Sequence, residues 1–297
     1  MNKIINIKKS GSETMNILIK TKVISTLALT ALLSTLVLTG CGQSSSQNNS
    51  KVIVTGSTSV QELAEQLGSE FENKTKTVVD VQGVGSTAGI KAVNDGTCDI
   101  GTSSRELKAE EKAWNLTETK IALDGIAVII NKNNKVADLT KDQLVKIYKG
   151  EIKNWKEVGG DDKEIILVSR EAGSGTRGAF EELLKLEKKE GDKTISLVAA
   201  DAAVVEGNGA VLSNVAGKDN AIGYMSLGMV NDSKVNKVKI DGIEATVENI
   251  KSGKYVVSRP FLMLTKAEPK KEAKEFLDFI LSDEGQKIVS EKFISVK

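Results

Sequence analysis

The stretch from Ser169 to Glu182 constrains the fold more than any other part of the chain. It reads SREAGSGTRGAFEE and lies between two kinds of regular structure. The apolar, β-branched run from Glu164 to Val168 before it is typical of a strand, and apolar residues recur at helical spacing from Phe180 to Leu186. We therefore expect a turn that leads from a strand into a helix.

This turn has the composition of an anion site. Its glycines let the backbone approach a ligand closely, its hydroxyls stand at a helix start with free N–H groups, and its arginines carry planar forks of donors suited to a tetrahedral oxyanion. The residues concerned are Arg170, Gly173, Ser174, Gly175, Thr176 and Arg177. A glycine-rich turn with a hydroxyl cap and two solvated arginines is the alternative interpretation.

The first forty residues predict a signal peptide that is not part of the fold. A basic lead precedes an uncharged apolar segment from Val23 to Leu38, which is short for a membrane span. The sequence Leu-Thr-Gly before Cys41 resembles the lipobox of bacterial lipoproteins, in which the cysteine is diacylated and becomes the mature N-terminus. A buried apolar segment is the alternative, and a start at Met1 or at Met15 gives the same mature chain.

The remaining chain is long enough for two domains. Residues 41–50 have the composition of a flexible, lipid-anchored tether, so we expect the folded part to begin near Lys51. The residues beyond this point suffice for two full cores. We expect domain I to comprise residues 51–123 and 257–297, and domain II to comprise residues 124–256.

The composition excludes several classes of function. The chain has no histidine, which excludes Ser-His-Asp catalysis, Cys-His catalysis and histidine-ligated metal sites. From Cys41 onward it carries 36 basic and 39 acidic residues, a balance that gives no support to nucleic-acid binding. Cys98 is left without a disulfide partner once Cys41 is acylated, and we expect it to be a small buried hydrophobe. We expect no catalytic residue, cofactor or metal.

Three more strand ends carry hydroxyl-rich turns. The runs from Lys51 to Thr55, Thr77 to Val81 and Asp99 to Ser103 are of strand type, and the turns GSTS, GVGST and SR follow them. A parallel sheet gathers such ends along one edge, where ligands bind. The hydroxyl residues at these ends are Thr58, Ser59, Ser86 and Ser104.

Two long apolar runs predict crossings between the domains. They extend from Ile121 to Asn131 and from Lys254 to Thr265, and Pro260 in the second run favours a bend or an edge position. Such crossings place the first three turns on one wall of a cleft and the central motif on the other. An anion between the walls then stabilises the closed state. The Gly- and Ala-rich region from Ala199 to Gly217 is assigned no element.

The motifs together resemble those of the phosphate-binding lipoproteins that serve Pst-type ABC importers. The resemblance covers essentially the whole mature chain and implies an α/β, two-domain fold of the type II periplasmic-binding-protein kind, with a ligand cleft between domains joined by two crossing strands. The matching segments are GSTSV (56–60), QGVGSTAGIKAV (82–93), GTSSREL (101–107), LTKDQLVKIYKGEIKNW (139–155), SREAGSGTRGAFEE (169–182) and AIGY (221–224).

The resemblance implies a function and a set of ligands. It implies capture of inorganic phosphate by a monomeric protein, anchored by lipid at the extracytoplasmic face of the cell membrane, and delivery to the permease subunits of an ABC importer. The implied phosphate ligands are Thr58, Ser59, Ser86, Arg170, Ser174, Gly175 and Thr176.

One position departs from the family pattern. An aspartate that accepts the proton of bound phosphate often follows the third strand in this family, and Ser104 stands there in this chain. A hydroxyl can donate as well as accept, so it does not by itself repel sulfate. Asp124, in the first crossing strand, is the leading substitute acceptor and Glu171 the second. Asp124 as a hinge residue bonded to nearby backbone is the alternative.

Other functions remain open at this point. A binder of sulfate, molybdate or tungstate would use the same fold. A secreted phosphoryl-processing enzyme would need a nucleophile with its base, or a metal site, and the sequence offers neither. A structural surface protein would leave the hydroxyl-rich turns unexplained.

Overall fold

The computed structural model describes residues 50–191 and 193–297, so the predicted signal peptide, Cys41 and most of the tether lie outside the described residues. The main sheet contains, from one edge to the other, β2 (Val78–Gly83), β1 (Lys51–Gly56), β3 (Ile100–Ser103), β13 (Ser258–Thr265), β4 (Thr117–Asn131), β10 (Ala221–Ser226), β6 (Ile166–Arg170) and β9 (Ala203–Val205). Two short strands, β11 (Val235–Lys237) and β14 (Ile294–Ser295), also pair with β4.

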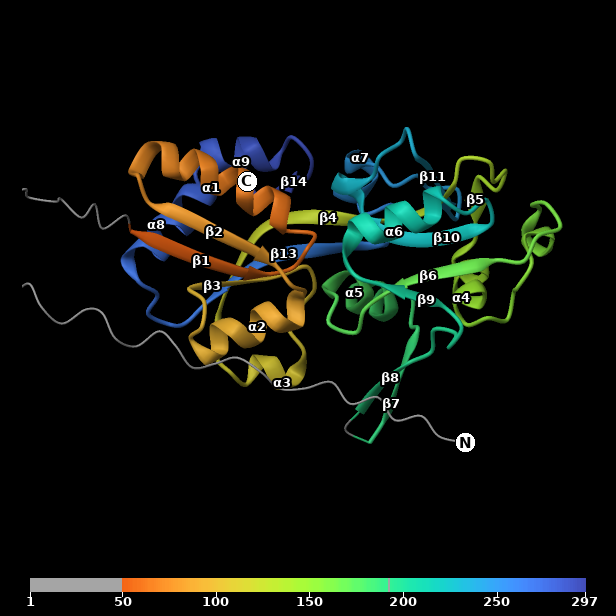
Figure 1. The fold of residues 1–297 in the computed structure, drawn as a ribbon, viewed down its shortest axis with the longest axis horizontal. Coiled ribbons are helices and arrows are strands. Elements are labelled where there is room, and N and C mark those ends of the chain that lie inside the picture. Colours follow the sequence, from red (N-terminus) through yellow and green to blue (C-terminus); the bar gives the residue numbers. More distant parts are fainter. Residues whose placement is uncertain (1–49, 192) are drawn as a thin grey trace, which may run out of the picture. The chain divides into compact units, whose positions relative to one another are not determined.

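Two hydrophobic clusters pack around β1, β2 and β3, and we call this part of the structure lobe I. Figure 1 shows α1, α8 and α9 over one face of these strands and α2 and α3 over the other. Leu63, Leu67 and Phe71 lie on the buried face of α1, and the ring of Phe71 lies 5.2 Å from that of Phe276 in α8. The helices are α1 (Gln61–Thr75), α2 (Ser86–Asp95), α3 (Ala109–Lys112), α8 (Lys271–Ile280) and α9 (Asp283–Val289).

Another hydrophobic cluster packs around β6, β9 and β10, and we call this part lobe II. Its centre is aromatic, because the rings of Phe180 and Tyr224 stack with centroids 3.9 Å apart and Tyr148 packs edge-on against Phe180. The helices are α4 (Lys141–Tyr148), α5 (Gly175–Leu183), α6 (Gly207–Ala216) and α7 (Val247–Lys251), with 3-10 segments at Trp155–Val158 and Leu227–Met229. Two small sheets pair β5 (Asp138–Leu139) with β12 (Lys239–Ile240), and β7 (Glu187–Glu190) with β8 (Lys193–Ser196).

Strand β4 belongs to both lobes. Its residues 117–125 pair with β13, and its residues 126–130 pair with β10 of lobe II. Strand β13 pairs with β3 of lobe I through Leu262 to Leu264, and its register with β4 shifts directly after Phe261, one residue beyond Pro260. β4 and β13 are therefore the two crossing strands that the sequence predicts, although the second begins at Ser258 rather than Lys254.

The strand ends of lobe I meet at one edge. β1 runs parallel to both β2 and β3, so the turns that follow all three strands leave the sheet on the same side. This arrangement confirms the parallel sheet predicted from the sequence.

Two local predictions were wrong or incomplete. The helix after the central motif ends at Leu183 and does not reach Leu186, because Lys185 adopts a left-handed conformation with φ of 56°. The region from Ala199 to Gly217 contains helix α6, whose Val211 and Val215 are fully buried. Packing against the sheet thus overrides the low helix propensity of its glycines.

Candidate functional site

The end of β1 leads into α1, the first helix of lobe I. β1 ends at Gly56, where a Cβ atom would lie 2.2 Å from the carbonyl oxygen of Thr102, so only glycine permits this approach. The backbone N–H of Ser57 donates to the same oxygen at 3.1 Å. The chain then enters α1 through Thr58 and Ser59, and Ser59 is 1% exposed. Two hydroxyls are thereby fixed at a helix start.

Serines from the other two strand ends lie beside this position. Ser86 opens α2 after β2, Ser104 follows β3, and both are fully buried. Ser57 Oγ donates to Ser104 Oγ at 2.8 Å, and the backbone N–H of Ser104 donates to Ser86 Oγ at 3.1 Å. Three turns that are separate in the sequence therefore bring their hydroxyls together.

The start of α5 supplies a second group of donors, from lobe II. Ser174 caps this helix, because its Oγ accepts from the backbone N–H of Arg177 at 3.2 Å. Gly175 and Thr176 form the first helical turn, and Thr176 is 1% exposed. The free N–H groups of a first turn favour a bound anion.

Arg170 lies at the end of β6, in the strand and not in the turn that follows it. Its side chain is 1% exposed, and its Nε and Nη2 atoms donate to the two carboxylate oxygens of Glu171 at 2.8 and 2.7 Å. Nη2 also donates to the Thr58 hydroxyl of lobe I at 3.1 Å. Arg170 therefore has a fixed orientation at the boundary between the lobes.

Arg177, the other arginine of the motif, is bound within lobe II. Its Nε donates to Glu181 at 2.6 Å, and its Nη1 donates to the backbone carbonyl of Arg170 at 2.9 Å. This arginine supports the strand end that carries Arg170.

The two lobes touch through the predicted residues. The hydroxyl oxygens of Ser59 and Thr176 lie 3.0 Å apart. A Cβ atom at Gly175 would lie 2.1 Å from Ser86 Oγ and 2.9 Å from Ser86 Cβ, so rotation of the serine hydroxyl alone would not make room for it. The absence of a side chain at Gly175 thus allows α5 to approach lobe I this closely.

A buried ion pair adjoins these hydroxyls. Asp124 of β4 and Arg259 of β13 are cross-strand partners, and Arg259 donates to Asp124 Oδ2 from Nε at 3.2 Å and from Nη2 at 2.9 Å. Both side chains are 1% exposed. Burial raises the pKa of the Asp124 carboxyl, and the charge of Arg259 opposes that rise. The pair places one negative and one positive group beside the hydroxyls.

Two residues of this network are missing from the sequence-based prediction. Arg259 donates to Ser59 Oγ at 3.1 Å and to the carbonyl of Ser104 at 3.2 Å, and Asn208 of α6 donates to Ser59 Oγ at 3.0 Å. The position of Arg259 inside an apolar run could have marked it as a member of the network, because a buried charge needs partners. No local pattern marks Asn208.

The chemistry of the described residues does not point to a metal or to a reactive thiol. They contain no group of three or more histidine, cysteine or acidic side chains that could hold a metal ion. Cys98 is buried in lobe I as predicted, and burial raises the pKa of its thiol to about 11, so little thiolate forms at neutral pH.

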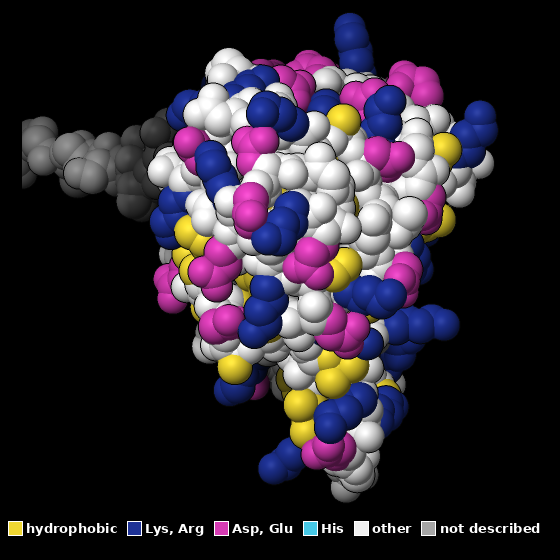
Figure 2. All heavy atoms as spheres, turned by 90° about the vertical axis from the view of Figure 1, so that its right-hand side faces the viewer, with side chains coloured by type: hydrophobic (Ala, Val, Ile, Leu, Met, Phe, Trp, Pro, Cys, Tyr) yellow, Lys and Arg dark blue, Asp and Glu magenta, His cyan; other side chains and the backbone are white. Residues whose placement is uncertain are grey.

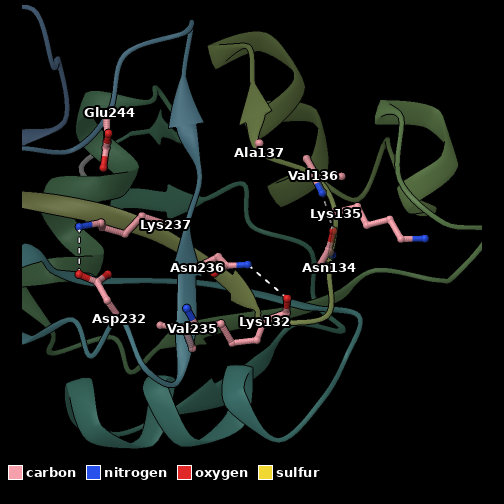
Figure 3. A pocket seen from close by; sticks show the side chains of 10 residues that line it. All are labelled: Lys132, Asn134, Lys135, Val136, Ala137, Asp232, Val235, Asn236, Lys237 and Glu244. Atoms are coloured by element: carbon pink, nitrogen blue, oxygen red, sulfur yellow. Dashed lines mark hydrogen bonds and ion pairs between the residues drawn. The ribbon is translucent and has the colours of Figure 1, made fainter.

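The surface charge is mixed, in agreement with the composition. Figure 2 shows basic and acidic side chains interspersed over the face that it presents. A separate hollow lies beside β11, lined among others by Lys132, Lys135, Asp232, Lys237 and Glu244 (Figure 3), and Lys237 pairs there with Asp232 at 3.4 Å. None of the predicted site residues lines this hollow.

Comparisons with known proteins show which family the chain belongs to. The family model described as a PBP superfamily domain matches residues 42–284. The phosphate-binding protein PstS of Borreliella burgdorferi is 32% identical over 275 residues, which cover 90% of this chain and 96% of that protein. The protein of the same name from Bacillus subtilis is 34% identical over 80% of this chain and 77% of its own length.

The chain belongs to the PstS family of the PBP superfamily.

Solved structures of PstS-like proteins match the fold. A protein from Clostridium perfringens, described as a phosphate ABC transporter substrate-binding protein with bound phosphate, is 46% identical with a TM-score of 0.78. An ABC-type phosphate transport receptor from Vibrio cholerae is 39% identical with a TM-score of 0.71. Each match covers 83% of this chain and all of the other. The predicted α/β, two-domain, type II fold is confirmed for this PstS-family chain.

Proposed function

We propose that this PstS-family protein captures inorganic phosphate between lobe I and lobe II and delivers it to an ABC importer. The contact of helix starts from both lobes carries the proposal, because it surrounds one small region with hydroxyls, free N–H groups and the fork of Arg170. Such donors suit a tetrahedral anion. The phosphate-bound relative from Clostridium perfringens supports this assignment.

The ligand residues follow from this arrangement. Oxygen atoms of phosphate would take the place of the direct contacts between hydroxyls of the two lobes, and Arg170 would supply the counter-charge. The proposed ligands are Thr58, Ser59, Ser86, Ser104, Arg170, Ser174, Gly175 and Thr176. Asp124 is the proposed acceptor of the phosphate proton, because Arg259 donates only to its Oδ2, whereas both oxygens of Glu171 accept from Arg170.

Phosphate release requires the lobes to separate. We assign residues 51–123 and 257–297 to domain I and residues 124–256 to domain II, so that β4 and β13 are the hinge. Phosphate then stabilises the closed state, because only that state lets donors of both lobes reach it.

The protein is proposed to act as a monomeric binding protein without catalysis, and the description of the Clostridium perfringens relative as a substrate-binding protein supports a binding role. Its position at the extracytoplasmic face would come from a lipid on Cys41, which also keeps it near the permease subunits. No helix among the described residues is long and apolar enough to cross a membrane.

Replacing Cys41 with serine should block normal processing or release the protein into the medium, and unchanged retention with normal processing would contradict the anchor.

Calorimetric titration of the purified protein with phosphate, sulfate and molybdate tests the function. We expect saturable binding of one phosphate per chain and much weaker binding of the other two anions. Stronger binding of sulfate or molybdate would instead support the alternative oxyanion carrier, and hydrolysis of a phosphate ester by the purified protein would support an enzyme.

A further inference from the structure

The Ser59 hydroxyl has three hydrogen-bond partners, more than the hydroxyl of any other predicted ligand among the described residues. Its side chain is 1% exposed, and three polar atoms surround Oγ: Asn208 Nδ2 at 3.0 Å, Arg259 Nη2 at 3.1 Å and Thr176 Oγ1 at 3.0 Å. The first two come from different elements, α6 and β13. The direction of each hydrogen bond decides what Ser59 can offer to a ligand.

The amide of Asn208 has one orientation only. Its Oδ1 accepts from the backbone N–H of Ser226 at 3.2 Å and from Arg170 Nη1 at 3.5 Å, and both of these groups are obligate donors. The opposite orientation would point the amide N–H groups at two further donors. Nδ2 therefore faces Ser59 and donates to it.

Arg259 is likewise an obligate donor with a fixed position. Its guanidinium has no acceptor atom, and it is held by Asp124 Oδ2 at 2.9 Å and by the carbonyl of Ser104 at 3.2 Å. The N–H that remains on Nη2 points at Ser59 Oγ.

A serine hydroxyl accepts two hydrogen bonds and donates one. Because Asn208 and Arg259 occupy both acceptor positions of Ser59 Oγ, its proton must be donated, and the acceptor in this structure is Thr176 Oγ1. We propose that Asn208 and Arg259 are positioning residues that make Ser59 an obligate donor to the bound anion. This inference rests on the proposed function, since it assigns the anion to the position between Ser59 and Thr176.

This arrangement of Asn208, Arg259 and Ser59 favours an anionic oxygen as the group that binds the Ser59 hydroxyl. A hydroxyl that is free to rotate does not discriminate between an anion and a neutral hydroxyl, because it can donate to the first or accept from the second. Ser59 in its present surroundings can only donate. When an anionic oxygen accepts the hydrogen bond from Ser59 in place of Thr176, the hydroxyl of Thr176 is free to donate to the same ligand, and both hydroxyls then act as donors.

A double-mutant cycle on phosphate affinity tests the proposal. Asn208→Leu, Ser59→Ala and the double variant are titrated calorimetrically with inorganic phosphate. Asn208 is the better probe, because replacing Arg259 would leave Asp124 as an unpaired buried charge. Asn214→Leu is the matched control on the same helix: its side chain bonds to the Ala210 carbonyl and to Lys218 but to no predicted ligand, so this variant should bind like the wild type.

We expect Asn208→Leu to weaken phosphate binding by roughly tenfold or more, the effect of misdirecting one hydrogen bond to a charged group. In the Ser59→Ala background the same change should cost less than about twofold, because its target is gone. An equal loss in both backgrounds would show that Asn208 acts through Arg170 and would overturn the proposal, as would wild-type affinity of Asn208→Leu.

Two further measurements keep these outcomes distinct. Thermal unfolding without phosphate shows whether Asn208→Leu folds, and Asn208→Ser replaces it in the cycle if it does not. The wild type is titrated first. Its failure to bind phosphate would contradict the proposed function itself, whereas binding by the wild type with an additive cycle would overturn only the role of Asn208.

Discussion

Ser59 and Thr176 are 117 residues apart in the sequence, and their hydroxyl oxygens lie 3.0 Å apart in the structure. Each residue stands at a helix start, one in lobe I and the other in lobe II. With the proposed hinge, this contact belongs to the closed state, so a ligand that bridges these two hydroxyls would favour closure by the free energy of the contacts that it makes with both sides.

Arg170→Ala should weaken phosphate binding far more than Arg177→Ala. Removal of Arg170 takes away the main counter-charge and leaves the Glu171 carboxylate, which Arg170 now binds at 2.7 Å, facing the anion without a partner. The expected loss is about 2 to 5 kcal/mol. Arg177 binds Glu181 and the backbone of Arg170, so its loss should cost about 1 kcal/mol through positioning. Calorimetric titrations that gave equal losses would mean that both forks contact phosphate.

Gly175→Ala should prevent full closure. The new methyl group would lie 2.1 Å from Ser86 Oγ, and overpacking of this kind costs about 1 to 3 kcal/mol, or roughly fivefold to 150-fold in affinity. Gly173→Ala is the matched control in the same turn, because a Cβ there has no atom within 4 Å. Phosphate affinities of the two variants are compared by titration, and equal affinities would contradict this role of Gly175.

The wild type should prefer phosphate to sulfate by well over a hundredfold, and Asp124→Asn should narrow that preference, chiefly by weakening phosphate binding. Phosphate keeps a proton near neutral pH and sulfate has none, so an unpaired acceptor faces sulfate unfavourably, at a cost of about 1 to 3 kcal/mol or more. The change also removes the negative charge beside Arg259. Because this removal favours the binding of phosphate and sulfate alike, the ratio of the two affinities is the informative quantity. If the ratio stays constant, Asp124 is not the acceptor and Glu171→Gln becomes the next variant to measure.

Local sequence patterns were sufficient for the helix starts of this site. The turns at Thr58, Ser86 and Ser174 each follow a strand-type run, and parallel pairing then brings the first two together. The chemistry of a strand-turn-helix unit is contained within a few residues, which is why the sequence predicts it.

Long-range contacts account for what the sequence did not predict. Asn208 and Arg259 reach Ser59 from 149 and 200 residues away, and nothing in their own neighbourhoods specifies this partner. The same holds for α6, where Gly207 and Gly209 weaken the local helix signal while Val211 is buried against the sheet. Tertiary packing decides such elements, and propensity alone does not.

Small-angle scattering of the purified protein, with and without saturating phosphate, tests most directly the claim that phosphate joins the two lobes. We expect a smaller radius of gyration with phosphate for the wild type and for Gly173→Ala, and a smaller decrease or none for Gly175→Ala. An identical radius for the wild type in both states, at a phosphate concentration shown by calorimetry to saturate the protein, would contradict it.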